Sequence, residues 1–434
     1  MITLINKILN EIESLDIEVS DQALVNRRNS GSFYTPIDVA ENLVNSLFDS
    51  LKIQNTRSLK KAINNNVFIE PSVGSGIFLF SLVKKILEFN IDPKYLKNLK
   101  VHLIDINPKC ITFIRKIIKQ HNLPLDPEYY SQDFLKYKKF YKNKNNIVFG
   151  NPPFVKLSDQ IHSNLYESFI THSILNDCDI YFIVPFSIIF SKDFNNLRLL
   201  LKQYKCSANF SNYDNIPDCL FNFGKPDSLN SNRANSQRCS IISIVKNKQF
   251  KITSSPLTRW KKSQRSEILH KQLKSFDITN LFLKKNIYAS PLNNKIIKIF
   301  CNDRLPRLGN FFNFRGPAKL HVAQVARNFI SIREKGGPSV HTFYFISIKE
   351  KLHFLTIISS KQFFEYWRSF GDGFHLTKSN ISQFPVTKKL ENFDDKRFLA
   401  AKKIYFNQSE YKFSRKILNN RVVTLNFLGV FDEI

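Results

Sequence analysis

Short apolar runs alternate with stretches of helical spacing along roughly the first half of the chain. The runs at residues 67–70, 101–104, 147–150 and 179–185 are bounded by polar, glycine or proline residues, as buried strands are. Between them, apolar residues recur at intervals of three and four, which is typical of helices that pack on a sheet. The alternation predicts an α/β fold with an open parallel sheet, whose ligand crevice lies at the carboxyl ends of the strands.

The first residues have the pattern of an amphipathic helix. Ile5, Ile8, Leu9, Ile12 and Leu15 fall at helical spacing, so we expect a helix that docks on the domain through this face. The segment carries acidic residues and lacks the basic-then-apolar order of a signal peptide.

A second helix is expected directly after Thr35 and Pro36. Apolar residues at helical spacing follow, and Thr35 can cap the helix with Pro36 at its first position. Taken alone, this segment predicts only a capped helix start.

The strand at 147–150 ends in Asn151-Pro152-Pro153-Phe154. Two prolines remove two backbone donors and fix two φ angles, so this loop is stiff. The Asn151 side-chain oxygen and the Pro152 carbonyl can both accept hydrogen bonds from an amino group, and Phe154 can stack on the ring that carries it. The loop predicts a planar substrate bearing an NH2 group. The alternative is a simple strand terminator.

A glycine turn follows the strand that ends at Glu70 and Pro71. Gly74 and Gly76 let the backbone approach a ligand closely, as in the first turn of doubly wound nucleotide-binding sheets. The spacing is not GxGxxG, and a purely structural turn is about equally compatible with it.

Acidic residues also follow two further strands. Asp105 ends the run at 101–104, a position that holds ribose hydroxyls in such folds. Asp133 and Phe134 form an acid–aromatic pair that can hold an adenine by its amino group and its face. Together with Asn151, these residues predict a ligand crevice at one edge of the sheet.

Positive charge is concentrated in the second part of the chain. Residues 1–245 contain 29 Lys and Arg against 23 Asp and Glu, whereas residues 246–434 contain 35 against 13. Basic residues there are interleaved with aromatic residues and glycine turns. A polyanion such as double-stranded DNA is therefore the expected partner.

The remaining composition favours a cytoplasmic protein without a metal site. The six cysteines form no CxxC pair, and the nine histidines form no HxxxH or HExxH pattern. The longest uncharged apolar stretch, residues 180–191, is too short to span a bilayer, so we expect no membrane association.

The order of these motifs resembles the gamma-class DNA N6-adenine methyltransferases, of which the TaqI-type enzyme, with its NPPF-like motif, is the best known. The resemblance covers residues 30 to about 245. It implies an S-adenosylmethionine-dependent methyltransferase sheet over residues 1–245. A basic DNA target-recognition domain of mixed α/β or α+β structure would then occupy residues 246–434.

The resemblance also implies a role for individual residues. Asp105 would bind the cofactor ribose and Asp133 its adenine, while Asn151 and Pro152 would accept from the amino group of a flipped adenine. Phe154 would stack on that base, and a second aromatic residue would be Phe221 or Phe223. The full set expected to line the S-adenosylmethionine site is Thr35, Glu70, Pro71, Gly74, Gly76, Asp105, Ile106, Asp133, Phe134, Asn151 and Phe169, of which Phe169 is equally compatible with an ordinary core position.

Two other classes of function remain open on the sequence. One is a methyltransferase of the same fold that acts on RNA or a protein glutamine, and the other is a catalytically idle DNA-binding subunit. The long basic second part favours DNA over a protein substrate, and every expected catalytic residue type is present. We expect a monomeric DNA adenine methyltransferase of a restriction-modification or epigenetic system. Any cognate restriction endonuclease would be encoded separately, because the sequence contains no nuclease motif.

Overall fold

The computed structural model describes most of the chain. The described residues are 1–22, 35–157, 164–215, 218–221, 237–247, 249–283, 298–313, 315–326, 330–333, 336–399, 412–418 and 421–425. They form two compact units, and each has its own sheet.

The first unit comprises residues 1–255 and 260–283, and the second comprises 256–259 and 284–434. The expected boundary after residue 245 therefore lies inside the first unit. The reason is strand pairing, because β8 (Lys251–Ser254) pairs with β6 (Cys206–Tyr213) and extends the first sheet beyond that point.

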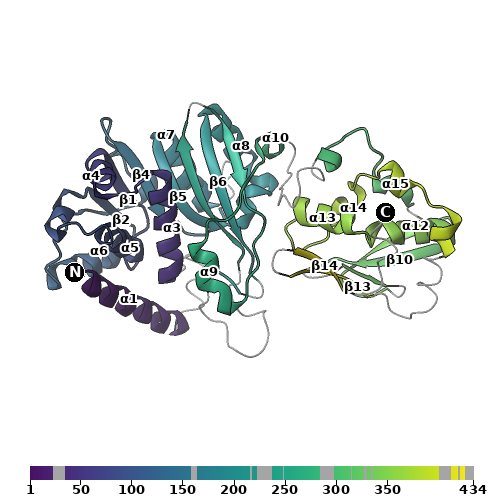
Figure 1. The fold of residues 1–434 in the computed structure, drawn as a ribbon, viewed down its shortest axis with the longest axis horizontal. Helices are drawn as coiled ribbons and strands as arrows, with labels where there is room; N and C mark the ends of the chain where they lie inside the picture. The colour runs from purple at the N-terminus through teal and green to yellow at the C-terminus, as the bar shows by residue number, and fades with distance from the viewer. Residues whose placement is uncertain are drawn as a thin grey trace. The chain divides into compact units, whose positions relative to one another are not determined.

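A nine-stranded sheet forms the centre of the first unit (Figure 1). Its strands, in spatial order, are β3 (Glu128–Ser131), β2 (Val101–Asp105), β1 (Asn66–Glu70), β4 (Asn145–Gly150), β5 (Cys178–Pro185), β7 (Cys239–Lys246), β6, β8 and β9 (Phe276–Asp277). The first five are mutually parallel, as the sequence predicts. β7 enters antiparallel between β5 and β6, so the complete sheet is mixed.

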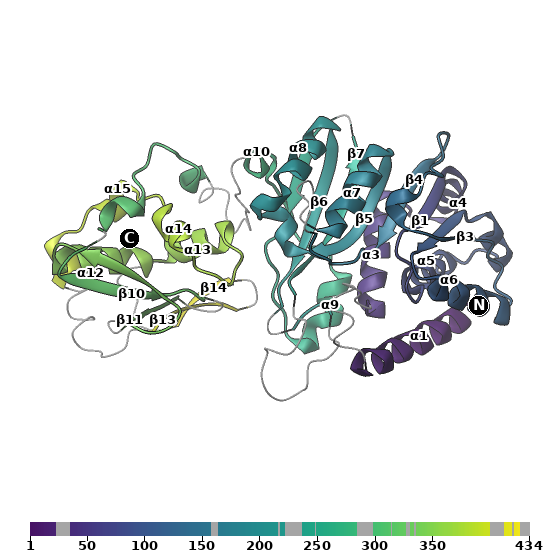
Figure 2. The same ribbon diagram turned by 180° about the vertical axis from the view of Figure 1, so that it is seen from behind.

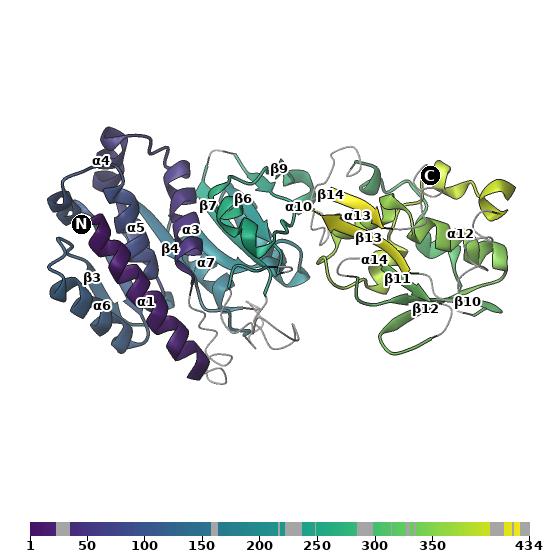
Figure 3. The same cartoon turned by 60° about the horizontal axis from the view of Figure 1, so that its bottom comes forward.

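Helices cover the sheet in two groups. α1 (Ile2–Gln22), α3 (Ile37–Ser50) and α5 (Ile77–Leu87) lie side by side and share one core with the sheet (Figure 3). α7 (Leu165–Leu175) packs on β5 and α8 (Asn195–Gln203) packs on β6 (Figure 2). The other helices of this unit are α4 (Thr56–Asn65), α6 (Pro108–Gln120), α9 (Arg265–His270), α10 (Thr279–Phe282) and the 3-10 segments η1 (Pro93–Asn98), η2 (Phe134–Lys136), η3 (Phe186–Ile189), η4 (Lys192–Phe194) and η5 (Lys262–Gln264).

The N-terminal helix docks through the expected face. Ile5, Ile8, Leu9 and Ile12 are all buried in the core of the first unit. Leu15 is 46% exposed, so the prediction that it belongs to the docked face is wrong. Of these five apolar residues, the buried ones therefore end at Ile12.

The start of α3 also differs from expectation. Pro36 occupies the N-cap position, Ile37 is the first helical residue, and no side chain of the cap residue bonds the helix. The hydroxyl of Thr35 bonds a distant side chain instead. The N–H of Ile37 donates to Glu13 of α1 at 2.9 Å, which supplies the capping acceptor from another helix.

The second unit has an α+β arrangement. Its antiparallel sheet has the order β12 (Val340–Phe345), β10 (Ala318–Ala323), β11 (Ile330–Arg333), β13 (Lys412–Leu418) and β14 (Arg421–Leu425). The helical segments are η6 (Leu308–Phe311), α12 (Ile348–Ile358), α13 (Lys361–Phe370), α14 (Lys378–Ser382) and α15 (Lys388–Glu391). Trp367 and Arg368 are buried, so this adjacent aromatic and basic pair belongs to the interior of the unit.

Candidate active site

The carboxyl ends of three neighbouring parallel strands carry the polar residues singled out in the sequence. Glu70 ends β1, Asp105 ends β2, and Asn151 follows β4. β1 lies between β2 and β4 in the sheet, so the three ends meet at one edge. The predicted crevice residues are therefore brought together by the sheet topology itself.

The glycine turn after β1 is tied directly to the end of β2. Gly74 and Gly76 have φ values of 52° and 81°, which side chains rarely tolerate. The Gly74 N–H donates to Asp105 Oδ2 at 2.9 Å, and the Asn107 N–H donates to Oδ1 of the same carboxylate at 2.8 Å. A Cβ at Gly74 would meet no atom within 4 Å, so open space adjoins the turn there.

Glu70 is completely buried beneath this turn. Neither carboxylate oxygen has a hydrogen-bond partner in usual geometry among the described residues. Burial and the neighbouring Asp105 raise the pKa of Glu70 well above its ordinary value. The Leu79 amide lowers this pKa, but its effect is smaller. A buried acid whose oxygens make no hydrogen bond of usual geometry provides acceptors for a cationic or hydrogen-bond-donating ligand group.

Ile106 lies directly after Asp105 with an unusual exposure. Its side chain is 76% exposed, whereas Asp105 is only 9% exposed. Burial also raises the pKa of Asp105. An exposed large apolar side chain beside a buried carboxylate offers a surface on which a flat ring can lie.

Asp133 and Phe134 follow β3 and begin η2. Asp133 Oδ1 accepts from the Leu135 N–H at 2.9 Å, which fixes the carboxylate at the start of the 3-10 turn. Phe134 is buried and its ring centroid lies 5.0 Å from that of Phe169 in α7. Phe169 thus supports Phe134 from behind.

The Asn151 loop is held from two sides. Asn151 Nδ2 donates to Thr35 Oγ1 at 3.1 Å, and the Ser72 hydroxyl donates to the Asn151 carbonyl at 3.0 Å. Sequence reasoning did not assign a role to Ser72, whose only signal is a hydroxyl within the glycine turn. The first contact orients the Asn151 amide, because its nitrogen faces Thr35.

Phe154 meets Phe221 beyond this loop. The two ring centroids are 6.2 Å apart with an interplanar angle of 84°, and Phe154 also packs edge-on against Tyr166. Phe221 is 5% exposed. The structure therefore brings one of the two candidate aromatic residues to Phe154, while Phe223 lies outside the described residues.

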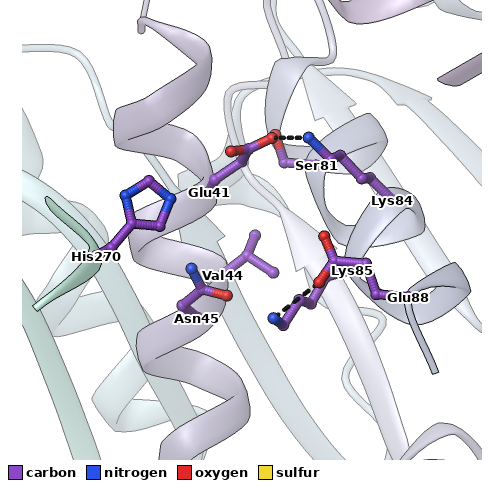
Figure 4. Close-up of a pocket in the computed structure, with 8 residues that line it drawn as sticks. All are labelled: Glu41, Val44, Asn45, Ser81, Lys84, Lys85, Glu88 and His270. Atoms are coloured by element: carbon purple, nitrogen blue, oxygen red, sulfur yellow. Dashed lines mark hydrogen bonds and ion pairs between the residues drawn. The ribbon is translucent and has the colours of Figure 1, made fainter. Parts of the chain in front are cut away.

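A separate hollow of about 120 Å³ lies between α3 and the later turns of α5 (Figure 4). It contains two ion pairs, Lys84–Glu41 at 2.6 Å and Lys85–Glu88 at 2.9 Å. Its lining residues are Glu41, Val44, Asn45, Ser81, Lys84, Lys85, Glu88 and His270. No residue of the predicted crevice lines this hollow.

Neither a metal-binding cluster nor a membrane-spanning helix occurs among the residues that the structure describes. Within the parts of the chain that the structure describes, no group of three or more His, Cys, Asp or Glu residues is placed to hold a metal ion. None of the described helices combines the length and apolar character needed to cross a bilayer.

Residues 17–184 match the family model described as N-6 DNA Methylase. The match covers less than half of the chain, but it includes Thr35, the glycine turn, Asp105, Asp133 and the Asn151 loop. No curated protein matches the chain in sequence.

Several solved structures are similar to the chain at low identity. The DrdV–DNA complex has 12% identity, a TM-score of 0.45, and coverage of 70% of this chain and 36% of that chain. A nuclease-deletion mutant of the Type ISP restriction-modification enzyme LlaGI, with a DNA substrate mimic, has 13% identity, a TM-score of 0.43, and coverage of 68% and 34%. A type I restriction-modification methyltransferase subunit from Streptococcus thermophilus has 15% identity, a TM-score of 0.41, and coverage of 58% of both chains. The chain thus spans about a third of the length of the first two.

Proposed function

We propose that this protein is a DNA adenine N6-methyltransferase, which uses S-adenosylmethionine to methylate the 6-amino group of a flipped adenine. The observation that carries the proposal is the Asn151 loop, held by Thr35 and Ser72 beside a glycine turn and a buried acid pair. The match of residues 17–184 to the N-6 DNA Methylase family supports the same reaction.

The crevice residues fit the proposed cofactor in chemical type. The buried Glu70 carboxylate suits the cationic amino acid part, and Asp105 has acceptor capacity left for ribose hydroxyls after its two backbone contacts. Ile106 and Phe134 supply apolar surface for the adenine ring, and Asp133 supplies an acceptor for its amino group. The open space at Gly74 admits a ligand close to the backbone.

S-adenosylmethionine supplies an electrophilic methyl group on a sulfonium sulfur. Asn151 and Pro152 act on the other reactant, the adenine amino group. The lone pair of the amino nitrogen is delocalised into the ring. When both N–H bonds donate to acceptors, the nitrogen shifts toward tetrahedral geometry and its lone pair becomes available for attack. Asn151 and Pro152 would hold the amino nitrogen toward the methyl group of bound S-adenosylmethionine. The methyl group would pass to the nitrogen as its bond to sulfur breaks, S-adenosylhomocysteine would leave, and the extra proton of the cationic nitrogen would be released to water. The loop contributes mainly positioning and charge stabilisation.

The aromatic geometry defines how a flipped base would lie. A base that stacks flat on Phe154 would meet Phe221 through an edge, because the two rings are nearly perpendicular. Flipping costs a few kcal/mol, and base–aromatic stacking returns roughly 1–3 kcal/mol per base. Contacts to Phe154 and Phe221 thus offset much of the cost.

Double-stranded DNA is the proposed partner because of the uneven charge. The 35 Lys and Arg against 13 Asp and Glu in residues 246–434 are suited to phosphate contacts. Sequence choice would come from side chains of the same part that reach base edges.

Modification sequencing of DNA from cells that express the protein tests the proposal. We expect N6-methyladenine in a defined motif, and its loss in Asn151→Ala with cofactor affinity within a few-fold of wild type. Asn196→Ala, an exposed position on α8, is the matched control and should keep full activity. Methylation of RNA or of a protein glutamine instead, or unchanged methylation in Asn151→Ala, would refute the proposal.

A further inference from the structure

The side chain of Arg265, the first residue of α9, joins two distant parts of the first unit. Its Nε and Nη2 donate to the two carboxylate oxygens of Asp38 at 2.5 and 2.9 Å. The same guanidinium donates to the carbonyls of Cys219 and Leu220, at 2.6 and 2.8 Å. These carbonyls belong to the two residues that directly precede Phe221.

A second side chain strengthens this attachment. Trp260 is 1% exposed, and its Nε1 donates to Asp218 Oδ2 at 2.9 Å. The Asp218 carboxylate also lies 3.6 Å from Arg265. Three successive residues before Phe221 are thus held by groups that follow residue 259.

The Asp38 end of this network reaches the proposed catalytic loop. Asp38 lies in the first turn of α3, three positions after Thr35, whose hydroxyl bonds Asn151. Glu13 of α1 fixes the same turn through the Ile37 N–H. The first turn of α3 therefore connects Asn151 on one side with Arg265 on the other.

A planar guanidinium suits this arrangement better than any other side chain. It offers five donors in a rigid fork, so it can bind a carboxylate with two donors and two carbonyls with the others. A lysine keeps the positive charge but is a point charge with compact donors, and cannot reproduce the fork. The Arg265 side chain is 12% exposed, so water competes little for these bonds.

We propose that Arg265 is a positioning residue, which holds the backbone at Cys219 and Leu220 so that Phe221 stays edge-on to Phe154. The inference rests on the proposed function, in which Phe154 and Phe221 receive the flipped adenine. In this proposal Arg265 has no direct role toward the base or the cofactor. It acts through Phe221.

The first test observes Phe221 without any catalytic assay. A fluorinated phenylalanine placed at position 221 of the full-length protein gives a fluorine resonance that reports the packing of its ring. Arg265→Lys should shift or broaden this resonance. Arg198→Lys should leave it unchanged, although Arg198 is also a buried arginine that donates to a carbonyl, that of Ser191 at 2.8 Å. An unchanged resonance in Arg265→Lys would overturn the proposal.

The second test is a double-mutant cycle on methyl transfer in a single turnover. We expect Arg265→Lys to lower the rate about tenfold with cofactor affinity within twofold, and to add little further loss in the Phe221→Ala background. Additive losses, or an equal loss of cofactor binding, would contradict action through Phe221. If the fluorine resonance responds but wild-type protein methylates no adenine, the positioning role stands and the proposed function fails.

Discussion

Asn151 Nδ2 lies 3.1 Å from Thr35 Oγ1, and this contact joins residues 116 positions apart in the chain. Thr35 is only 3% exposed, so the bond is shielded from water. Because the amide nitrogen is engaged by Thr35, the orientation of the whole Asn151 side chain depends on a hydroxyl that precedes α3. A hydroxyl at position 35 thus fixes which Asn151 atom can accept from a substrate.

Thr35→Val tests this orientation with little change in side-chain shape. Loss of the hydroxyl leaves the Asn151 amide without one of its partners, which costs about 1–3 kcal/mol for a buried group. We expect the methyl-transfer rate to fall by between roughly fivefold and 150-fold on that basis. Thr35→Ser, which keeps the hydroxyl, should stay near the wild-type rate in the same single-turnover assay. A Val variant as active as the Ser variant would show that the contact has no influence on catalysis.

The pKa of Glu70 predicts a pH dependence of cofactor binding. Burial and Asp105 raise this pKa above the ordinary 4.5, so in the free enzyme the group stays protonated above the pH at which an exposed Glu ionises. A cationic ligand group favours the carboxylate form. Affinity should therefore rise as pH increases from the ordinary value through the raised one, and binding should release a proton.

Calorimetry in two buffers of different ionisation enthalpy measures that proton release. Glu70→Gln cannot ionise and should lack this component, while any component from Asp105 should remain. Proton uptake on binding, or the same proton release in Glu70→Gln, would exclude Glu70 as the group that ionises.

Ile106 provides a separate test of the cofactor site. Because its side chain is already 76% exposed, Ile106→Ser should leave the free energy of unfolding within about 0.5 kcal/mol of wild type. If the side chain packs on the cofactor ring, binding should weaken by about 1–2 kcal/mol, or roughly five- to thirtyfold. Leu199→Ser, at a 61% exposed position on α8, should change neither quantity. Unaltered cofactor affinity in Ile106→Ser would place the ring elsewhere.

The sequence predicts the parallel half of the sheet well because its signals are local. Each strand is an apolar run that ends in a distinctive residue, such as Glu70, Asp105 or Asn151, and parallel packing then brings these ends together. The antiparallel entry of β7 and the addition of β8 and β9 depend on long-range pairing. Such pairing leaves no periodicity in the sequence. This is why the domain boundary predicted after residue 245 lies before the end of the first unit.

Contacts between distant residues account for the rest of what the sequence does not reveal. Thr35 was expected to cap a helix, since Thr before Pro is compatible with that role, yet its hydroxyl bonds Asn151. Arg265 belongs to the basic second part of the chain, for which the sequence predicts contacts with a polyanion. Only the folded structure shows that its guanidinium binds Asp38 and two carbonyls.

Asp179, which is not among the proposed active-site residues, should make the free energy of unfolding depend on pH. Burial raises its pKa from 3.8 to about 6, opposed by a hydrogen bond from the Lys246 N–H. The folded state thus holds this proton more tightly than the unfolded state. The stabilisation from the proton is complete below 3.8 and is lost as the pH rises to about 6.

Asp179→Asn removes this loss. We expect the variant to be more stable than wild type by about 1–2 kcal/mol near pH 8, after allowance for partial exposure, and to show no gain near pH 4. Chemical denaturation at both pH values measures the difference. Asp177→Asn changes an exposed carboxylate that pairs with Lys246, and should alter stability by less than about 1 kcal/mol. A gain for Asp179→Asn that is equal at both pH values would rule out titration as its cause.

The extent of the first unit determines where a domain exchange should be made. An exchange after residue 245 would remove β8, which pairs with β6, and also Trp260 and Arg265, which hold Asp218 and the carbonyls before Phe221. An exchange after Leu283 keeps all of these contacts. We expect a hybrid of residues 1–283 with the C-terminal part of a related enzyme to bind cofactor and to methylate adenine. The hybrid made after residue 245 should lose thermal stability and activity.

Because base-reading side chains are proposed to lie in the C-terminal part, the motif found by modification sequencing should be that of the enzyme that donates it. A motif that instead follows residues 1–283 would place sequence recognition in the first unit.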